Sequence, residues 1–146
     1  MKQVTIYTDG SSLGNPGSGG WAAHLSYAAT KKEIYGYQSD ATNNQMELLA
    51  AIKALALLKN KCNVDLYTDS TYLRDGITKW IHNWLKNDWR SSTKKPVKNK
   101  ELWQELYNLT KLHQINWHWV KAHNGNEHNE RVDFLARNAA ENKINI

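Results

Sequence analysis

The segment at residues 41–60, ATNNQMELLAAIKALALLKN, constrains the fold most, because it is typical of a helix and lies between two strand-like runs. Thr42 and Gln45 have the form of a capping box, which predicts a helix that begins at the residue after Thr42. The flanking runs, 3–8 and 64–68, have the pattern of short strands. A strand, a crossover helix and a second strand predict that the two strands are parallel neighbours, which indicates an α/β protein.

The rest of the chain adds three strands and three helices to this unit. The glycine-rich segment at residues 10–20 is predicted to be a loop, and residues 88–99 a polar connection. The predicted strands are 21–28, 31–39 and 115–120, and the predicted helices are 71–87 with a break near Gly76, 100–112 and 127–142.

The net charge of +5 comes from one segment, residues 79–100, which contains seven Lys or Arg and one acid, Asp88. Trp80, Trp84 and Trp89 lie in the same segment. Cations interleaved with flat rings suit a phosphate backbone with sugars or bases beside it. A solvated basic helix with a few core tryptophans explains this composition equally well.

Several classes of protein are excluded or disfavoured by what the chain contains. No run approaches the ~18 apolar residues of a membrane span, and the N-terminus, MKQVTIYTDG, lacks the apolar region of a signal peptide. A single cysteine, Cys62, excludes an intrachain disulfide and a cysteine zinc site. We therefore expect a cytoplasmic protein with no membrane association.

Two strand-like runs end on the same tripeptide, YTD, at Asp9 and Asp69. Parallel neighbours place both carboxylates at the sheet end where α/β proteins bind ligands, and the two would repel unless a cation lay between them. Glu47 is the only charged residue between Met46 and Ile52, on a helix that is apolar nearly all round. The helix dipole explains a Glu in the first turns, but not its apolar surroundings, so we favour a functional role.

Asp133 is a fourth candidate with a simpler explanation, because Arg137 four residues later is typical of a surface ion pair. The preceding loop, KAHNGN, carries His123, which is free to approach a substrate, whereas His118 in the WHW strand is expected to pack. Four acids and one loop histidine suggest a two-metal site. Two Mg²⁺ ions roughly 3.5–4 Å apart can hold the attacking and leaving oxygens of a phosphoryl displacement.

Six segments of the chain resemble the bacterial ribonuclease HI family in order and spacing. They are YTDGSSLGNPGSGG, TNNQMELLAAI, YTDSTY, GITKWIHNW, KKPVKN and WVKAHNGNEHNERVDFLAR, and the resemblance runs from Val4 to Ala140. It implies one domain over residues 1–146, with a five-stranded mixed sheet of three antiparallel strands followed by parallel strands, flanked by helices. It also implies an endoribonuclease that hydrolyses the RNA strand of RNA–DNA hybrids and leaves 5′-phosphate and 3′-hydroxyl ends.

The resemblance assigns roles to particular residues. Asp9, Glu47, Asp69 and Asp133 would bind two Mg²⁺, which Mn²⁺ often replaces, and His123 would assist proton transfer or product release. The implied contacts to the RNA strand are Gly10, Ser11, Ser12, Asn15 and Asn43, with Glu47. The implied contacts to the DNA strand are Thr42, Asn44, Trp80 and Asn83, of which Thr42 and Asn83 would form a phosphate pocket. The basic protrusion of about 79–100 would add Trp84, Lys86, Lys94, Lys95 and Lys98.

The chain departs from the family pattern at a few positions. Asp40 occupies a position where some relatives carry Arg, and the basic run is interrupted around Asp88, so we expect weak hybrid affinity with a modest salt dependence. Ala122 replaces the usual Gly before His123. A monomer without an obligate protein partner is expected. Two alternatives stay open, a 3′–5′ exonuclease with the same metal chemistry and a non-catalytic hybrid-binding module.

Overall fold

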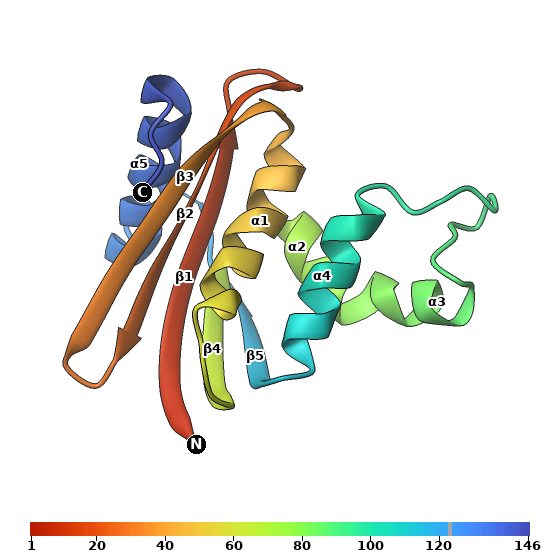
Figure 1. Cartoon of the computed structure of the whole chain (residues 1–146), viewed down its shortest axis with the longest axis horizontal. Coiled ribbons are helices and arrows are strands. Elements are labelled where there is room, and N and C mark those ends of the chain that lie inside the picture. The colour runs from red at the N-terminus through yellow and green to blue at the C-terminus, as the bar shows by residue number, and fades with distance from the viewer. Residues whose placement is uncertain (123) are drawn as a thin grey trace.

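The computed structural model describes residues 1–122 and 124–146. Over these residues it forms one five-stranded sheet in the order β3-β2-β1-β4-β5 (Figure 1). Strands β1, β2 and β3 are antiparallel neighbours, whereas β4 pairs parallel with β1 and β5 parallel with β4. This confirms the predicted mixed sheet. The strands are β1 Lys2–Ser12, β2 Gly17–Tyr27, β3 Thr30–Ala41, β4 Cys62–Thr68 and β5 Gln114–Trp119.

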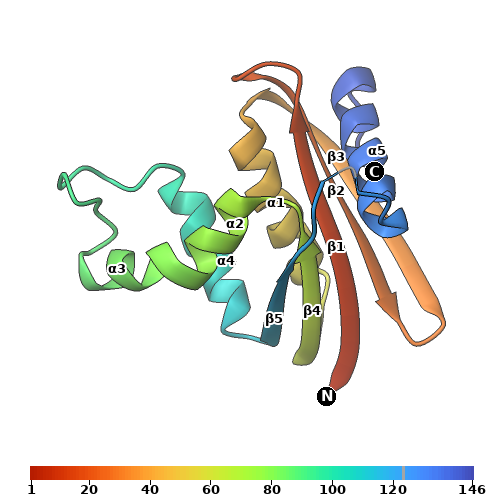
Figure 2. The same cartoon turned by 180° about the vertical axis from the view of Figure 1, so that it is seen from behind.

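Helices cover both faces of the sheet. Helices α1 and α4 lie on one face and α5 lies on the other (Figure 1, Figure 2). The predicted break near Gly76 is a short π-helix, η1, between α2 and α3. The bounds are α1 Asn43–Ala56, α2 Thr71–Asp75, η1 Gly76–Trp80, α3 Ile81–Lys86, α4 Lys100–Thr110 and α5 Glu127–Asn142. In the described part of the chain, no helix has both the length and the hydropathy needed to cross a bilayer.

The start of α1 is fixed by the predicted capping box. The backbone N–H of Gln45 donates to Thr42 Oγ1 at 3.2 Å, and the backbone N–H of Thr42 donates to Gln45 Oε1 at 3.0 Å. From this start the helix buries Met46, Leu48 and further apolar side chains. The cap therefore sets the rotation that carries Glu47 to the sheet end.

The prediction that residues 10–20 form a loop is wrong, because β1 continues to Ser12 and β2 begins at Gly17. The glycines in β2 serve close packing. A Cβ on Gly20 would collide with the carbonyl oxygen of Ala136 in α5. Glycine therefore lets α5 lie directly on the strand, and a high glycine content here does not indicate a turn.

The segment predicted as a basic protrusion extends away from the sheet beyond α2 (Figure 1). Its base is aromatic. The ring centroid of Trp84 lies 5.9 Å from that of Trp89 and 5.2 Å from that of the buried Trp103. Trp80 is 40% exposed. Two of the three tryptophans thus pack against the core, as the simpler explanation of the composition expected, while the lysines of this segment are exposed.

Candidate active site

Three carboxylates from three elements meet at one end of the sheet. Asp9 lies on β1, Glu47 in the first turns of α1, and Asp69 directly after β4. One ligand oxygen from each residue lies within 4.8 Å of the other two. Asp9 and Glu47 are only 4% and 5% exposed. This confirms the prediction that the two parallel strands bring Asp9 and Asp69 to the same sheet end.

Gly10 makes the approach of β1 to α1 possible. A Cβ at this position would collide with the backbone nitrogen of Glu47 and the backbone carbonyl carbon of Met46. The backbone N–H of Gly10 also donates to Asp9 Oδ1 at 2.9 Å, which orients that carboxylate. One glycine therefore brings Asp9 and Glu47 together and fixes one of them.

Burial and mutual repulsion raise the proton affinity of this cluster. Burial, with a contribution from the charge of Asp69, raises the pKa of Glu47 to about 8. Burial first, then the charges of Glu47 and Asp69, holds the pKa of Asp9 well above its ordinary value. Oε1 of Glu47 is buried and has no hydrogen-bond partner among the described residues. Crowded oxygen ligands with an unsatisfied buried atom fit a hard divalent cation.

Asp133 borders the same pocket from α5, on the far side of the sheet from α1. Its Oδ2 accepts a hydrogen bond from Nε of Arg137 at 3.1 Å and lies 3.1 Å from Nη2, so the ion pair predicted from the spacing is present. The structure therefore combines both predictions for Asp133: an ion pair with Arg137 and a place in the candidate site. The pocket has a volume of about 360 Å³ and is lined by Asp9, Gly10, Ser11, Asn43, Asn44, Glu47, Asp69, Ser70, Thr71, Tyr72, Ala122 and Asp133.

The residues that the resemblance assigns to the RNA strand lie at or beside the rim of this pocket. Gly10, Ser11, Asn43 and Glu47 line it directly. Asn15 Oδ1 accepts from the backbone N–H of Asn43 at 3.4 Å, and Ser12 Oγ donates to the carbonyl of Ala41 at 2.8 Å. These side chains hold the end of the β1–β2 hairpin against the start of α1.

The residues assigned to the DNA strand divide between two places. Trp80 and Asn83, with Trp84 of the protrusion, line a separate pocket of about 330 Å³, whereas Asn44 lines the carboxylate pocket. Thr42 caps α1 through its hydroxyl and borders neither of these two pockets. Lys86, Lys94, Lys95 and Lys98 are exposed, and Lys94 borders a neighbouring pocket with Arg90.

Ser70, Thr71 and Tyr72, which were not predicted as site residues, also line the pocket. Ser70 is the N-cap of α2, where its Oγ accepts from the N–H of Leu73 at 3.0 Å. A serine between a strand end and a helix start is a recognisable cap signal, so the motif YTDST could have indicated it. His123 lies outside the described residues.

His118 packs as predicted, and it also has a polar partner that was not predicted. Its ring stacks on that of Tyr67 with 4.5 Å between centroids. Its Nε2 lies 2.9 Å from Oδ1 of Asp65. The side chains of Asp65 and His118 lie on the sheet face away from α1, outside the lining of the carboxylate pocket.

The protonation of Glu47 predicts how stability depends on pH. Its pKa rises from an ordinary value of 4.5 to about 8 on folding, so the folded protein binds this proton more tightly than the unfolded chain. The free energy of unfolding of the metal-free protein should therefore fall as pH rises from 4.5 to about 8. Urea unfolding in the presence of a chelator measures this fall, and Glu47→Gln should flatten it. An equal slope in the variant contradicts the assignment.

Comparisons with known proteins agree with the resemblance. A family model described as RNase H matches residues 1–141. A curated relative named Ribonuclease H from Bradyrhizobium diazoefficiens is 60% identical over 134 residues, which cover 92% of this chain and 87% of that protein. Another, from Chelativorans sp. (strain BNC1), is 57% identical over 137 residues, covering 94% and 85%.

A solved structure gives the same result for the fold. The crystal structure of LC9-RNase H1, a type 1 RNase H with the type 2 active-site motif, superposes with a TM-score of 0.89 at 29% sequence identity. The superposition covers 98% of this chain and 74% of that chain. With the family model, the relatives and the fold in agreement, this chain belongs to the RNase H family.

Proposed function

We propose that the protein is an endoribonuclease that hydrolyses the RNA strand of RNA–DNA hybrids with two Mg²⁺ ions and leaves 5′-phosphate and 3′-hydroxyl ends. The observation that carries this proposal is the buried carboxylate cluster at the sheet end, in which Oε1 of Glu47 lacks a partner among the described residues. Relatives at 56–60% identity that are named Ribonuclease H support the same substrate class.

Asp9, Glu47 and Asp69 would hold one ion. Asp133, on the opposite side of the pocket, would help them to hold the second ion. Bound divalent ions supply Lewis-acid stabilisation of the charge that develops on phosphodiester oxygens. Oxygen-only ligands favour Mg²⁺, and Mn²⁺ suits the same set. Arg137 holds Asp133 at the pocket edge, where that carboxylate is 19% exposed and accessible to an ion.

The rim of the pocket offers groups that can recognise a ribose. The amide side chain of Asn43 and the backbone at Gly10 and Ser11 lie next to the carboxylates. A 2′-hydroxyl both donates and accepts hydrogen bonds, so such groups can distinguish RNA from DNA at the strand that is cut. The protrusion, with Trp80 and Asn83, would hold the second strand. His123 stays predicted to assist proton transfer or product release.

The test uses one labelled RNA strand, presented alone, paired with RNA or paired with DNA, each with and without Mg²⁺. Internal cuts in the hybrid alone, and only with the metal, are expected. An RNA strand blocked at both ends separates the proposal from an exonuclease, which needs a free end. Hybrid binding without cleavage in Mg²⁺ or Mn²⁺ would favour the non-catalytic binding module.

Removing two exposed lysines from the protrusion should weaken hybrid binding without changing catalysis. In Lys94→Ala/Lys95→Ala, the plot of log K against log salt should become shallower by about 2, because each phosphate contact contributes roughly one unit. Fluorescence anisotropy of the labelled hybrid, over a series of salt concentrations in Ca²⁺, measures this slope. Lys31→Ala/Lys32→Ala, an exposed pair on β3, is the matched control and should leave the slope unchanged.

The wild-type slope tests a second expectation from the sequence. Because Asp88 interrupts the basic run, a slope typical of fewer than six phosphate contacts is expected. A steeper wild-type slope, or an equal slope in the protrusion variant, contradicts this account of the protrusion. The cytoplasmic location and the monomeric state stay predictions of the sequence.

A further inference from the structure

Asp69 lies just beyond the last pair of residues that joins β4 to β5. The register of the two strands ends with Thr68 opposite Trp119, and the backbone N–H of Val120 donates to the carbonyl of Thr68 at 2.9 Å. On its other side, β4 pairs with β1 up to Tyr67. Asp69 therefore lies beyond the residues of β4 that pair with β5 and with β1, at a bend in the chain.

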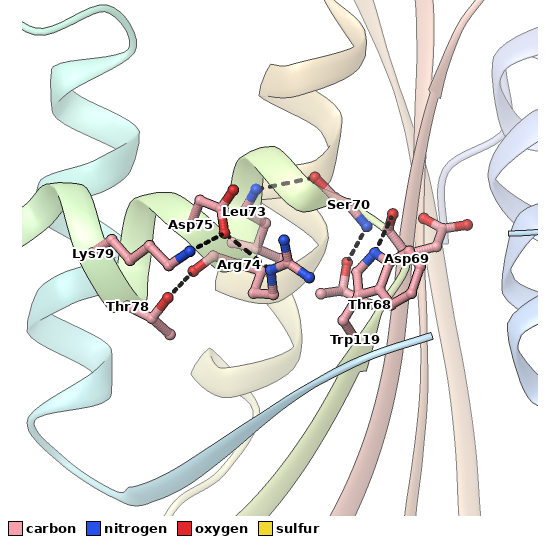
Figure 3. A network of polar contacts seen from close by, with 9 residues as sticks. All are labelled: Thr68, Asp69, Ser70, Leu73, Arg74, Asp75, Thr78, Lys79 and Trp119. Atoms are coloured by element: carbon pink, nitrogen blue, oxygen red, sulfur yellow. Dashed lines mark hydrogen bonds and ion pairs between the residues drawn. The ribbon is translucent and has the colours of Figure 1, made fainter. Parts of the chain in front are cut away.

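A hydrogen bond from a side chain of β5 reaches the backbone of Asp69. The indole N–H of Trp119 donates to the backbone carbonyl oxygen of Asp69 at 3.3 Å, across 50 positions in the sequence (Figure 3). The next residue is also held, because the N–H of Ser70 donates to Thr68 Oγ1 at 3.0 Å. Figure 3 shows the carboxylate of Asp69 pointing away from the indole. Trp119 thus contacts the backbone of Asp69 and leaves its carboxylate to the pocket.

Trp119 is 44% exposed, so burial in the core does not fix its ring. Arg74 on α2 lies against the indole instead, with its guanidinium carbon 5.6 Å from the ring centroid. Arg74 is itself oriented by Asp75, whose Oδ1 accepts from its Nε at 3.0 Å and lies 3.7 Å from Nζ of Lys79 (Figure 3). An exposed indole held by an oriented guanidinium can keep one orientation without being buried.

We infer that Trp119 is a positioning residue for the candidate metal site, fixing the backbone of Asp69 through its indole N–H while Arg74 holds the ring. The inference rests on the proposed function, because the group that it positions is a proposed metal ligand. Ligands held in place before an ion arrives bind it more tightly, since less freedom is lost on binding. Trp119 touches neither the pocket nor the reacting atoms in this account.

Trp119→Phe tests the inference because it removes the N–H and keeps a ring beside Arg74. Calorimetric titration of Mg²⁺ alone should give a dissociation constant about three- to tenfold higher than that of the wild type, the range for one hydrogen bond. The Mg²⁺ concentration for half-maximal cleavage should rise by a similar factor, while KM for the hybrid at saturating Mg²⁺ stays unchanged. Trp119→Ala should lose at least as much affinity.

Tyr27→Phe is the matched control. Tyr27 is 43% exposed, ends β2 at the opposite end of the sheet, and has Nζ of Lys2 5.1 Å from its ring centroid. Losing its hydroxyl should leave Mg²⁺ binding unchanged. The melting temperatures of all variants are measured alongside, so that a general loss of stability is distinguished from a loss of metal affinity.

Two results would overturn the inference alone. One is equal Mg²⁺ affinity in the wild type and Trp119→Phe. The other is a raised KM for the hybrid with unchanged Mg²⁺ affinity, which would make Trp119 a substrate contact. A wild-type protein that neither binds Mg²⁺ nor cuts the hybrid would overturn the proposed function and this inference together. The wild-type measurements in the titration and in the cleavage assay detect this outcome independently of the variants.

Discussion

Asp9→Asn is expected to abolish Mg²⁺-dependent cleavage of the hybrid while making the metal-free protein more stable. A metal ion contributes several kcal/mol to such a reaction, so losing a central ligand should reduce kcat by about a thousandfold or more. Asp9 is 4% exposed and next to two other acids. Its pKa is held well above the ordinary value by burial and then by the charges of Glu47 and Asp69, so the ionised side chain opposes folding at neutral pH.

The neutral amide removes that charge, and a rise in the melting temperature of about 5 °C is expected for the metal-free variant. Single-turnover cleavage and thermal unfolding with a chelator measure the two effects. Asp65→Asn is the matched control, on the neighbouring strand. Hydrogen bonds, chiefly from His118, lower the pKa of Asp65, so its amide variant should keep activity and lose stability. A lower melting temperature in Asp9→Asn would contradict the explanation by crowded charge.

Gly10→Ala should reduce both stability and catalysis, because the added methyl group has no space. It would collide with backbone atoms of Met46 and Glu47, which cannot rotate away as a side chain can. The expected loss of stability is about 1–3 kcal/mol, the range for overpacking. Separating β1 from α1 also moves Asp9 relative to Glu47, and misplacement by about 1 Å can reduce turnover roughly a hundredfold.

Urea unfolding and kcat at saturating Mg²⁺ measure the two losses separately. Gly36→Ala is the control, because its Cβ would lie 2.6 Å from a ring carbon of Trp21, away from the pocket. It should lose stability and keep the kcat of the folded protein. If Gly10→Ala also keeps its kcat, the close contact of β1 with α1 does not set the geometry of the carboxylates.

Short-range patterns in the sequence predict most of the arrangement of the site carboxylates. The capping box placed the start of α1, and the two YTD tripeptides placed Asp9 and Asp69, because a strand–helix–strand unit leaves little freedom to its ends. Glu47 was identified because a charge in an apolar helix needs an explanation. Asp133 needed the resemblance, since its spacing from Arg137 predicts an ion pair that is indeed present.

What the sequence did not predict depends on contacts between distant residues. The glycine-rich segment at residues 10–20 indicates a loop, yet Gly20 lies in β2, where Ala136 of α5, more than 100 positions later, packs against it. The bond from Trp119 to Asp69 likewise joins positions 50 residues apart and leaves no local pattern. Asn83 lines a pocket on the protrusion that Thr42 does not border, and the phosphate pocket that the two residues would form stays a prediction.

The most direct test of the central claim, that the acids at the sheet end form a divalent-cation site, is a titration of Mg²⁺ into the metal-free protein by calorimetry, repeated with Glu47→Gln. Saturable binding by the wild type is expected. The melting temperature should rise with Mg²⁺ concentration, and the free energy of unfolding should increase by about 2.7 kcal/mol at a hundredfold excess over the dissociation constant. Binding should be much weaker in the variant. No binding by the wild type, with an unchanged melting temperature, would contradict the account.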